Sequence, residues 1–316
     1  MNGPILVTGA AGFAGSHLLD LLGAADVPVV AWRRPGEALP PPPTGGACRW
    51  MEVDVLDRDN VEHAVREAAP SAVYHLAGAA HVGTSWDDSA ATLAVNVLGT
   101  WHLLASLAAL PGRPRTLVSG SALVYARQDR AISEDDPVGP ASPYAVSKLA
   151  QELAAAHAVR ELGLPVVITR SFNHIGPRQS PSFSSASFAR QIALAEAGRG
   201  PRELLVGNLD PRRDLTDVRD IVAAYRALLD AGAPGRVYNV CSGHAVRVRD
   251  VLDGLAALAR VPIDVRVDEA LLRPHDTPLV LGNPRRIREE IGWEPRIGLA
   301  DTLRDLLDYW REAILR

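Results

Sequence analysis

The chain has 316 residues, of which 47% are hydrophobic and 22% are charged, a composition typical of a folded globular protein. Its formal net charge of −4 argues against a protein that binds nucleic acid polymers. The two cysteines form no CxxC pair, which suggests neither a metal site nor a disulfide framework. The start of the chain shows no signal peptide and no apolar run reaches the length of a bilayer span, so we expect a cytoplasmic protein without a membrane partner.

Short apolar runs alternate with longer helical patterns in the first half of the chain. The runs lack polar alternation, as expected for parallel strands that helices cover on both faces. The predicted strands are Ile5–Thr8, Val27–Trp32, Trp50–Val53, Ala72–Leu76, Thr116–Ser119 and Val166–Thr169. The predicted helices between them are Gly15–Leu22, Asn60–Ala68, Thr92–Leu107 and Pro143–Leu162. These repeated β-α-β units predict an α/β fold with a doubly wound parallel Rossmann sheet.

The alternating pattern ends near residue 171, where loops rich in Ser, Pro and Arg begin. Helical patterns return at Ile221–Asp230, Val248–Ala259 and Leu299–Ile314. We therefore predict a Rossmann domain over residues 1–170 and a smaller, mainly substrate-binding C-terminal lobe over residues 171–316. Some later segments are expected to return to the first domain.

A glycine-rich loop follows the first predicted strand and opens the first helix. It contains Gly9, Gly12 and Gly15, with Phe13 and Ala14 between the last two glycines. Glycines let the backbone turn sharply and approach a pyrophosphate, to which the helix N-terminus offers free N–H groups. The spacing is not the standard Gly-x-Gly-x-x-Gly, but its place between strand and helix indicates a dinucleotide cradle rather than a purely structural turn.

Two arginines end the second predicted strand, where an NAD site usually has a carboxylate for the ribose 2′-hydroxyl. Arg33 and Arg34 instead suit a 2′-phosphate, because guanidinium groups pair bidentately with phosphate. The pair therefore favours NADP(H) over NAD(H), the alternative being a solvated basic loop. Asp54 follows the third strand, where it either accepts a hydrogen bond from the adenine amino group or forms a turn.

A tyrosine and a lysine lie one turn apart at the start of the fourth predicted helix. Ser142 can cap this helix and Pro143 suits its first position, so Tyr144 and Lys148 share one face. A nearby ammonium is expected to lower the phenol pKa from its usual value of about 10 and so make the tyrosine a proton donor. Ser121, just past the fifth predicted strand, can bind the substrate oxygen that Tyr144 protonates. These three residues are the predicted catalytic set.

These motifs resemble the extended branch of the short-chain dehydrogenase/reductase superfamily over essentially the whole chain. His75-Leu76-Ala77-Gly78, Asn96 and Gly292-Trp293-Glu294-Pro295 add to the resemblance. Segments 171–178, 206–210, 213–220 and 237–243 are similar to the group of GDP-mannose 4,6-dehydratases and GDP-4-keto-6-deoxy-mannose reductases. The resemblance implies a nucleotide-sugar substrate and a cofactor site that also includes Val55, Leu76, Ala77, Gly78, Tyr144 and Lys148.

The resemblance also implies substrate contacts in both halves of the chain. They are Ser85, Ser121, Asn173, Val206, Asn208, Arg213 and Arg273. The two arginines would contact the diphosphate of the sugar nucleotide, because guanidinium groups suit its oxygens. A surface or interface salt bridge is the alternative for each arginine, and His174 either contacts the ligand or is a hydrogen-bonded loop residue.

Leu123 departs from the dehydratases of this group, which carry a glutamate there. Loss of water between C5 and C6 of a hexose needs a proton-transfer group beside the ring, and leucine has none. The sequence therefore predicts an NADPH-dependent reductase of the C4 ketone of a nucleotide-linked 4-keto-6-deoxyhexose, with GDP as the favoured nucleotide. The alternatives are a nucleotide-sugar 4-epimerase, then a 4,6-dehydratase, then an inactive NADP-sensing protein. The resemblance implies a homodimer packed through Thr92–Leu107 and Pro143–Leu162.

Overall fold

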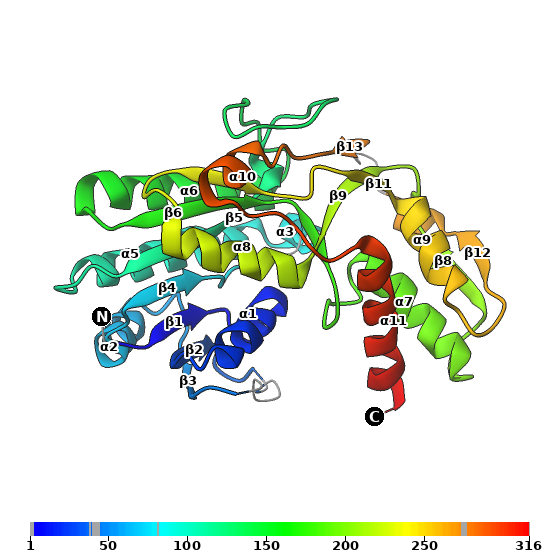
Figure 1. Ribbon diagram of the computed structural model, residues 1–316, viewed down its shortest axis with the longest axis horizontal. Coiled ribbons are helices and arrows are strands. Elements are labelled where there is room, and N and C mark those ends of the chain that lie inside the picture. The colour runs from blue at the N-terminus through cyan, green and yellow to red at the C-terminus, as the bar shows by residue number, and fades with distance from the viewer. Residues whose placement is uncertain (1–2, 38, 40–44, 81, 273–276, 316) are drawn as a thin grey trace.

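The computed structural model describes residues 3–37, 39, 45–80, 82–272 and 277–315. A sheet of seven parallel strands lies at its centre, in the order β10-β6-β5-β4-β1-β2-β3 (Figure 1). The strands are β1 (Ile5–Thr8), β2 (Val29–Arg33), β3 (Cys48–Glu52), β4 (Ala72–His75), β5 (Arg115–Ser121), β6 (Val166–Ser171) and β10 (Val237–Val240). The strand order reverses between β1 and β4, and ligands of such sheets bind at the carboxyl ends of the strands beside this reversal.

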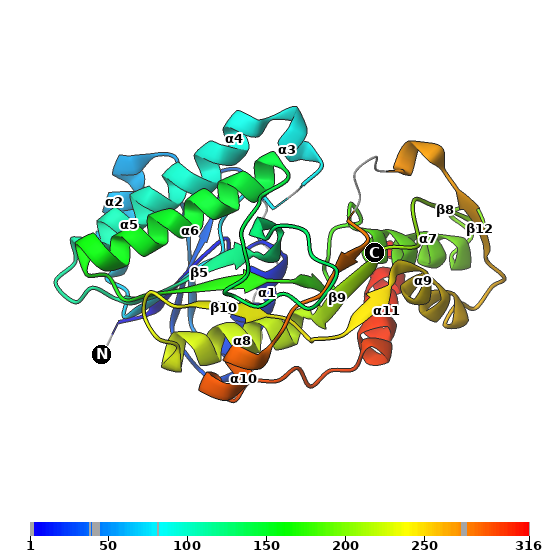
Figure 2. The same cartoon turned by 90° about the horizontal axis from the view of Figure 1, so that it is seen from above.

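Helices cover both faces of this sheet (Figures 1 and 2). The helices on one face are α1 (Phe13–Ala24), α8 (Val218–Ala231) and α10 (Arg285–Ile291). Those on the other face are α2 (Arg58–Ala68), α5 (Thr100–Ala108) and α6 (Pro143–Leu162). Neighbouring strand residues enter opposite layers: Val7 packs on the first and Leu6 on the second, and both are fully buried. Burial on both faces explains why the strands are apolar without alternation.

A smaller lobe lies beside the sheet, at the right in Figure 1. One of its sheets joins β7 (Asn173–Ile175), β9 (Arg212–Asp217), β11 (Ala245–Arg247) and β13 (Leu279–Val280), and the other joins β8 (Glu203–Val206) to β12 (Asp264–Val267). The helices α7 (Ser184–Glu196), α9 (Val248–Ala257) and α11 (Leu299–Leu315) share an apolar cluster that includes Phe188, Leu252 and Leu306. The sequence analysis did not predict these short strands, nor β10, which lies beside β6 in the main sheet.

Helix α6 has the bounds predicted from the sequence, and its end residues explain why. The Ser142 hydroxyl accepts a hydrogen bond from the Ala145 N–H at 3.1 Å, and Pro143 occupies the first position. Gly163 ends the helix with φ +63°, a left-handed conformation that suits glycine. The start of the helix is therefore fixed, and with it the placement of Tyr144 and Lys148.

A continuous helix runs over Ser89–Ala108, built from α4 (Ser89–Leu93), a π-helical segment η1 (Ala94–Gly99) and α5. It is long and apolar enough, by length and composition, to cross a membrane, so the expectation that no apolar run reaches that length is wrong. The prediction failed because the helix starts before Thr92 and continues through the π-helical turn. The α5 part is packed between α2 and α6.

Candidate active site

The glycine loop between β1 and α1 has no room for a side chain at Gly9 or Gly15. Gly9 has φ +65°, and a Cβ there would lie 2.6 Å from the backbone nitrogen of Ala77. A Cβ on Gly15 would collide with the Gly9 carbonyl oxygen, whereas one on Gly12 would meet only that oxygen, at 3.1 Å. Helix α1 begins after Gly12, and no side chain of the described residues caps it. Its first N–H groups therefore remain available to an anion, which fits a dinucleotide pyrophosphate.

The first turns of α1 are tied to the loop around β7. The rings of Phe13 and His174 stack with their centroids 5.6 Å apart and their planes 12° apart. Arg178, which has φ +70°, donates to His17 Nδ1 at 2.8 Å and to Asp20 at 2.6 Å. Burial lowers the pKa of His17 to about 4, which keeps the ring neutral and its Nδ1 free to accept. These contacts hold the cradle against the start of the second lobe.

The loop Leu76–Gly78 forms the other side of the cradle. The N–H of Ala77 donates to the Thr8 hydroxyl at 3.2 Å, which fixes the loop to the end of β1. A Cβ on Gly78 would lie 3.7 Å from the Nζ atom of Lys148. The predicted cofactor residues of this loop therefore lie between the glycine turn and the lysine.

The two arginines at the end of β2 have different environments. Arg33 forms an ion pair with Glu52, its neighbour on β3, and also donates to the carbonyl oxygen of Glu37. The side chain of Arg34 is exposed and makes no hydrogen bond or ion pair within the part of the chain that the structure describes. Arg34 is thus the arginine that can receive a phosphate without first losing a partner.

Asp54 and Val55 lie in the turn after β3. The exposed Asp54 accepts a hydrogen bond from the N–H of Leu56 at 2.9 Å, so it forms the turn that was the alternative to an adenine contact. The carbonyl oxygen of Val55 accepts from His102 on α5 at 3.0 Å. The turn is thereby anchored to the helix layer.

The three predicted catalytic residues meet at the carboxyl edge of β5. Ser121 is the last residue of that strand, and its hydroxyl lies close enough to the Tyr144 phenol to lower that phenol's pKa. Lys148 lies one turn further along α6 and donates to a β5 backbone carbonyl oxygen at 2.9 Å. All three side chains are buried. Leu123 is 37% exposed, and its N–H donates to the Ser121 hydroxyl at 3.2 Å.

Burial controls the proton affinity of the tyrosine and the lysine. It lowers the pKa of Lys148 to about 8 and raises the pKa of Tyr144, an effect that the nearby Ser121 hydroxyl opposes. The expected lowering of the phenol pKa by the ammonium is therefore wrong in this structure. The reason is that Lys148 bonds to a β5 carbonyl and to Gln151, and burial of the phenol dominates. A raised pKa keeps Tyr144 protonated at neutral pH.

Three predicted substrate residues of the second lobe are exposed or only partly buried. Asn173 begins β7 and is exposed. Asn208 is exposed and accepts from the N–H of Asp210 at 3.1 Å. Arg213 is partly buried on β9 and donates to the carbonyl oxygen of Thr277 at 2.7 Å.

Two other predicted substrate residues are buried, and one is not described. Val206 is 1% exposed and packs in the apolar cluster of the lobe, and its carbonyl oxygen accepts from the N–H of Asp268 at 2.8 Å, so in this structure it is closed to a ligand. Ser85 is fully buried; its hydroxyl donates to the Val82 carbonyl oxygen at 2.7 Å and accepts from the N–H of Tyr144 at 3.2 Å. It thereby positions the catalytic helix. Arg273 lies outside the described residues.

Buried polar residues beneath the catalytic set were missed as site residues by the sequence analysis. Asn96, in η1, accepts from the N–H of Ala79 at 2.8 Å and donates to the Ser147 hydroxyl at 2.8 Å. Thr100 and Gln151 are also fully buried and hydrogen-bond to each other at 2.7 Å. The available signal was the spacing of Asn96 and Thr100, which places two polar side chains on one face of an otherwise apolar helix.

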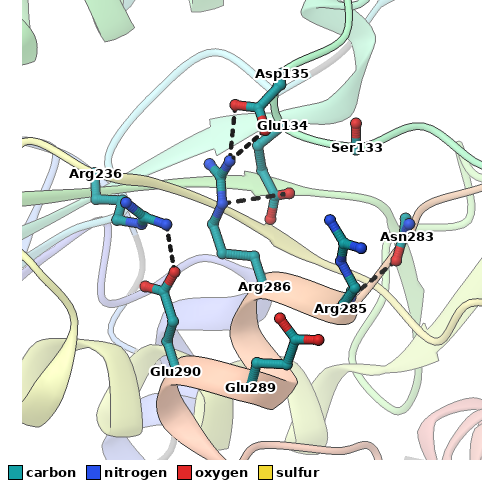
Figure 3. A pocket seen from close by; sticks show the side chains of 9 residues that line it. All are labelled: Ser133, Glu134, Asp135, Arg236, Asn283, Arg285, Arg286, Glu289 and Glu290. Atoms are coloured by element: carbon teal, nitrogen blue, oxygen red, sulfur yellow. Dashed lines mark hydrogen bonds and ion pairs between the residues drawn. The ribbon is translucent and has the colours of Figure 1, made fainter.

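A separate polar pocket lies between α10 and the loop at residues 133–135 (Figure 3). Arg286 pairs with Asp135 at 2.8 Å and with Glu134 at 3.7 Å, and Arg236 pairs with Glu290. None of the predicted site residues lines this pocket. Because its charges largely neutralise one another, we assign it no ligand.

A doubly wound parallel sheet, a glycine cradle at its strand reversal and a Ser-Tyr-Lys set at the same edge define the class. The protein is an NAD(P)-binding oxidoreductase of the short-chain dehydrogenase/reductase type. A family model described as GDP-mannose 4,6 dehydratase matches residues 6–306. The chain therefore belongs to the GDP-mannose 4,6-dehydratase family.

Three relatives illustrate this family relationship. GDP-6-deoxy-D-mannose reductase from Pseudomonas aeruginosa is 38% identical over 99% of this chain and 99% of its own. The solved structure of RMD from Pseudomonas aeruginosa complexed with NADPH is 36% identical, with a TM-score of 0.87 over 99% of this chain and 100% of its own. The structure of MoeE5 in complex with UDP-glucuronic acid and NAD is 31% identical, with a TM-score of 0.84 over 98% of this chain and 100% of its own.

Proposed function

We propose that this protein uses NADPH to reduce the C4 ketone of a nucleotide-linked 4-keto-6-deoxyhexose, with GDP as the nucleotide. The observation that carries the proposal is that Ser121, Tyr144 and Lys148 are buried together at the carboxyl edge of β5, with Lys148 beside the cofactor loop. The likeness to GDP-6-deoxy-D-mannose reductase across 99% of both chains supports the substrate.

The residues of the site divide the chemistry between them. NADPH, when bound at the glycine cradle, supplies the hydride for the ketone carbon. Tyr144 donates its proton to the carbonyl oxygen, and its raised pKa keeps that proton in place until the oxygen becomes basic. Ser121 hydrogen-bonds and orients the same oxygen. Lys148 would bind the cofactor ribose with the N–H donor that its contacts with Ser119 and Gln151 leave over.

The preference for NADPH is assigned mainly to Arg34. A 2′-phosphate that binds Arg33 would have to replace the carboxylate of Glu52. One ion pair would then be exchanged for another, so binding at Arg33 contributes little free energy. Arg34 has an exposed guanidinium that can pair with the phosphate directly. In this proposal Arg34→Ala reduces the preference for NADPH over NADH in kcat/KM by about tenfold or more, the worth of one charge-assisted contact. An equal or larger loss in Arg33→Ala would refute this assignment.

The reductase is preferred to the dehydratase because of Leu123. Its side chain follows Ser121 at the site edge and carries no ionisable proton, whereas elimination of water requires one. Asn173, Asn208 and Arg213, and Arg273 beyond the described residues, are the proposed contacts of the sugar nucleotide. The buried Ser85 would act by positioning α6, and the buried Val206 by packing in the apolar cluster of the lobe.

One assay tests the reaction. The purified protein is given NADPH and a GDP-linked 4-keto-6-deoxyhexose, and NADPH absorbance is followed together with the sugar product. Consumption of one NADPH per ketone supports the reductase. No consumption of NADPH with this ketone, together with conversion of a GDP-linked hexose into its C4 epimer without net loss of cofactor, would instead mean a 4-epimerase. Tyr144→Phe is expected to lose at least about a hundredfold in kcat, the usual scale of general acid catalysis, with cofactor affinity retained.

The same proposal includes a cytoplasmic homodimer and a division of the chain at residue 170, with α8, β10 and α10 returning to the Rossmann part. Exposed apolar side chains support the dimer: Leu93 and Leu98 on the long helix, and Val146 and Leu153 on α6. A partner's copies of these helices would cover them, which also accounts for the apolar character of Ser89–Ala108 without a membrane. Leu153→Glu should give a monomer in light scattering at concentrations where the unchanged protein is dimeric.

A further inference from the structure

Lys148 is the only lysine in the chain, and it is buried. Its ammonium donates to the carbonyl oxygen of Ser119 at 2.9 Å and to the Oε1 atom of Gln151 at 2.7 Å. An ammonium has three N–H donors, so within the described residues one is left for a ligand. The closeness of Nζ to Gly78 places the group beside the cofactor loop.

The side chain of Gln151 can adopt only one orientation here. The ammonium can only donate, so the amide oxygen must face Lys148 and the amide nitrogen must donate to the Thr100 hydroxyl, at 2.7 Å. Thr100 gives its own proton to the carbonyl oxygen of Asn96 at 2.7 Å. It must therefore accept from the Nε2–H of His75 as well, at 2.8 Å.

His75 continues these hydrogen bonds to the glycine cradle. With its proton on Nε2, its Nδ1 atom accepts from the Thr8 hydroxyl at 2.8 Å, and Thr8 accepts from the N–H of Ala77. Burial, and then the nearby Lys148, lower the pKa of His75 to about 3, so the ring is neutral at working pH. Thr8, His75, Thr100 and Gln151 are all fully buried. The network therefore has one proton arrangement.

We propose that Gln151 is a positioning residue for Lys148, whose amide oxygen holds the ammonium at the cofactor loop and supports its charged form. Thr100 and His75 fix the direction of that amide. Burial disfavours a charged lysine, and an amide oxygen at 2.7 Å opposes this effect. When turnover is measured, this inference rests on the proposed ketone reduction. When the pKa of Lys148 is measured directly, the inference is independent of that proposed function.

Few other groups compete for control of this lysine. Among the described residues, the titratable groups facing it are His75 from β4 and Tyr144 from its own helix. The polar groups packed around it from β5, η1 and α5 are carbonyl, amide and hydroxyl groups. His75 stays neutral and Tyr144 stays protonated near neutral pH, so neither carries a charge that competes with Gln151. Substitution of Gln151 is therefore expected to change the pKa of Lys148 more than substitution of its other neighbours.

A direct titration tests the proposal. Protein labelled with carbon-13 lysine has one lysine side chain, so its Cε resonance followed against pH reports Lys148 alone, without substrate. Gln151→Leu is expected to lower the lysine pKa, and Gln151→Glu to raise it, each by about one unit or more, as a charge-assisted hydrogen bond implies. The control Gln191→Leu removes another amide, which accepts from the N–H of Leu205 at 2.9 Å, and should leave the midpoint unchanged.

The pH profile of ketone reduction supplies the second readout. The alkaline limb of kcat/KM should move to lower pH in Gln151→Leu and to higher pH in Gln151→Glu, which a merely structural role would not produce. Equal midpoints in the unchanged protein and in Gln151→Glu would overturn the proposal. The Glu variant decides alone if the Leu variant does not fold. If the unchanged protein reduces no ketone while the midpoints still move apart, the proposed function fails and the role of Gln151 stands.

Discussion

The ion pair between Glu152 and Arg170 gives a stability prediction whose magnitude follows from its geometry. Arg170, on β6, donates to the two carboxylate oxygens of Glu152, on α6, at 2.9 and 2.6 Å. The side chains are only 7% and 10% exposed. Removing one partner of a buried pair leaves the other charge desolvated and typically costs about 3–5 kcal/mol. Glu152→Gln should therefore lower the folding equilibrium constant about a thousandfold, at roughly 1.4 kcal/mol per factor of ten.

Urea unfolding followed by circular dichroism measures this loss, and the same helix supplies a control. Arg160 and Glu161 form an exposed pair at 4.0 Å, with side chains 69% and 60% exposed. Glu161→Gln should cost less than about 1 kcal/mol, as exposed pairs do. The double variant Glu152→Leu, Arg170→Met should recover most of the stability, since no charge remains buried. If Glu152→Gln costs no more than Glu161→Gln, burial does not give this pair its importance and the reasoning is wrong.

Three further predictions concern the cradle, the acid limit and the second lobe. Gly15→Ala should weaken NADPH binding at least about tenfold in a fluorescence titration, because its Cβ would displace the Gly9 carbonyl. The pKa of His17 is lower in the folded than in the unfolded protein, so its contribution to stability is lost as pH falls from about 6.5 to about 4; His17→Gln should flatten this fall in urea unfolding by up to about 1.4 kcal/mol per pH unit. Asp214 is fully buried and accepts four hydrogen bonds from Ser242, Gly243 and Gly282, so Asp214→Asn should cost about 2–4 kcal/mol in thermal or urea unfolding, since its amide would face N–H donors.

The parallel sheet was predictable because its physical causes are local in the sequence. Buried strands such as β1 and β6 contain short apolar runs, and Ser142 and Pro143 mark the start of α6 as its cap and first residue. Strand β10 was missed because it returns from a distant part of the chain, and its Tyr238 and Asn239 interrupt the apolar run. Strands β11 and β13, with three and two residues, are set by pairing to β9 and carry no pattern of their own.

The candidate site also has features that could be predicted from the sequence and features that could not. The glycines and the Tyr144–Lys148 spacing were recognisable, because one loop and one helical turn contain each geometry. The environment of these groups was not, since it depends on the register of several strands. The phenol pKa was expected to fall, yet burial raises it, and the sequence did not reveal that Lys148 hydrogen-bonds to Gln151.

Arg33 shows why residue type alone does not assign a ligand. A guanidinium at the end of β2 can bind phosphate only with donors that are not already used. The register of β2 and β3 places Glu52 directly across from Arg33, and the two form an ion pair. The Arg33 guanidinium is therefore already paired and is not free to bind a phosphate. Arg34, one residue further, lies past the end of the strand and escapes that pairing. In the proposed function, the choice of NADPH therefore depends on where the pairing of β2 with β3 stops, which the two adjacent arginines in the sequence do not reveal.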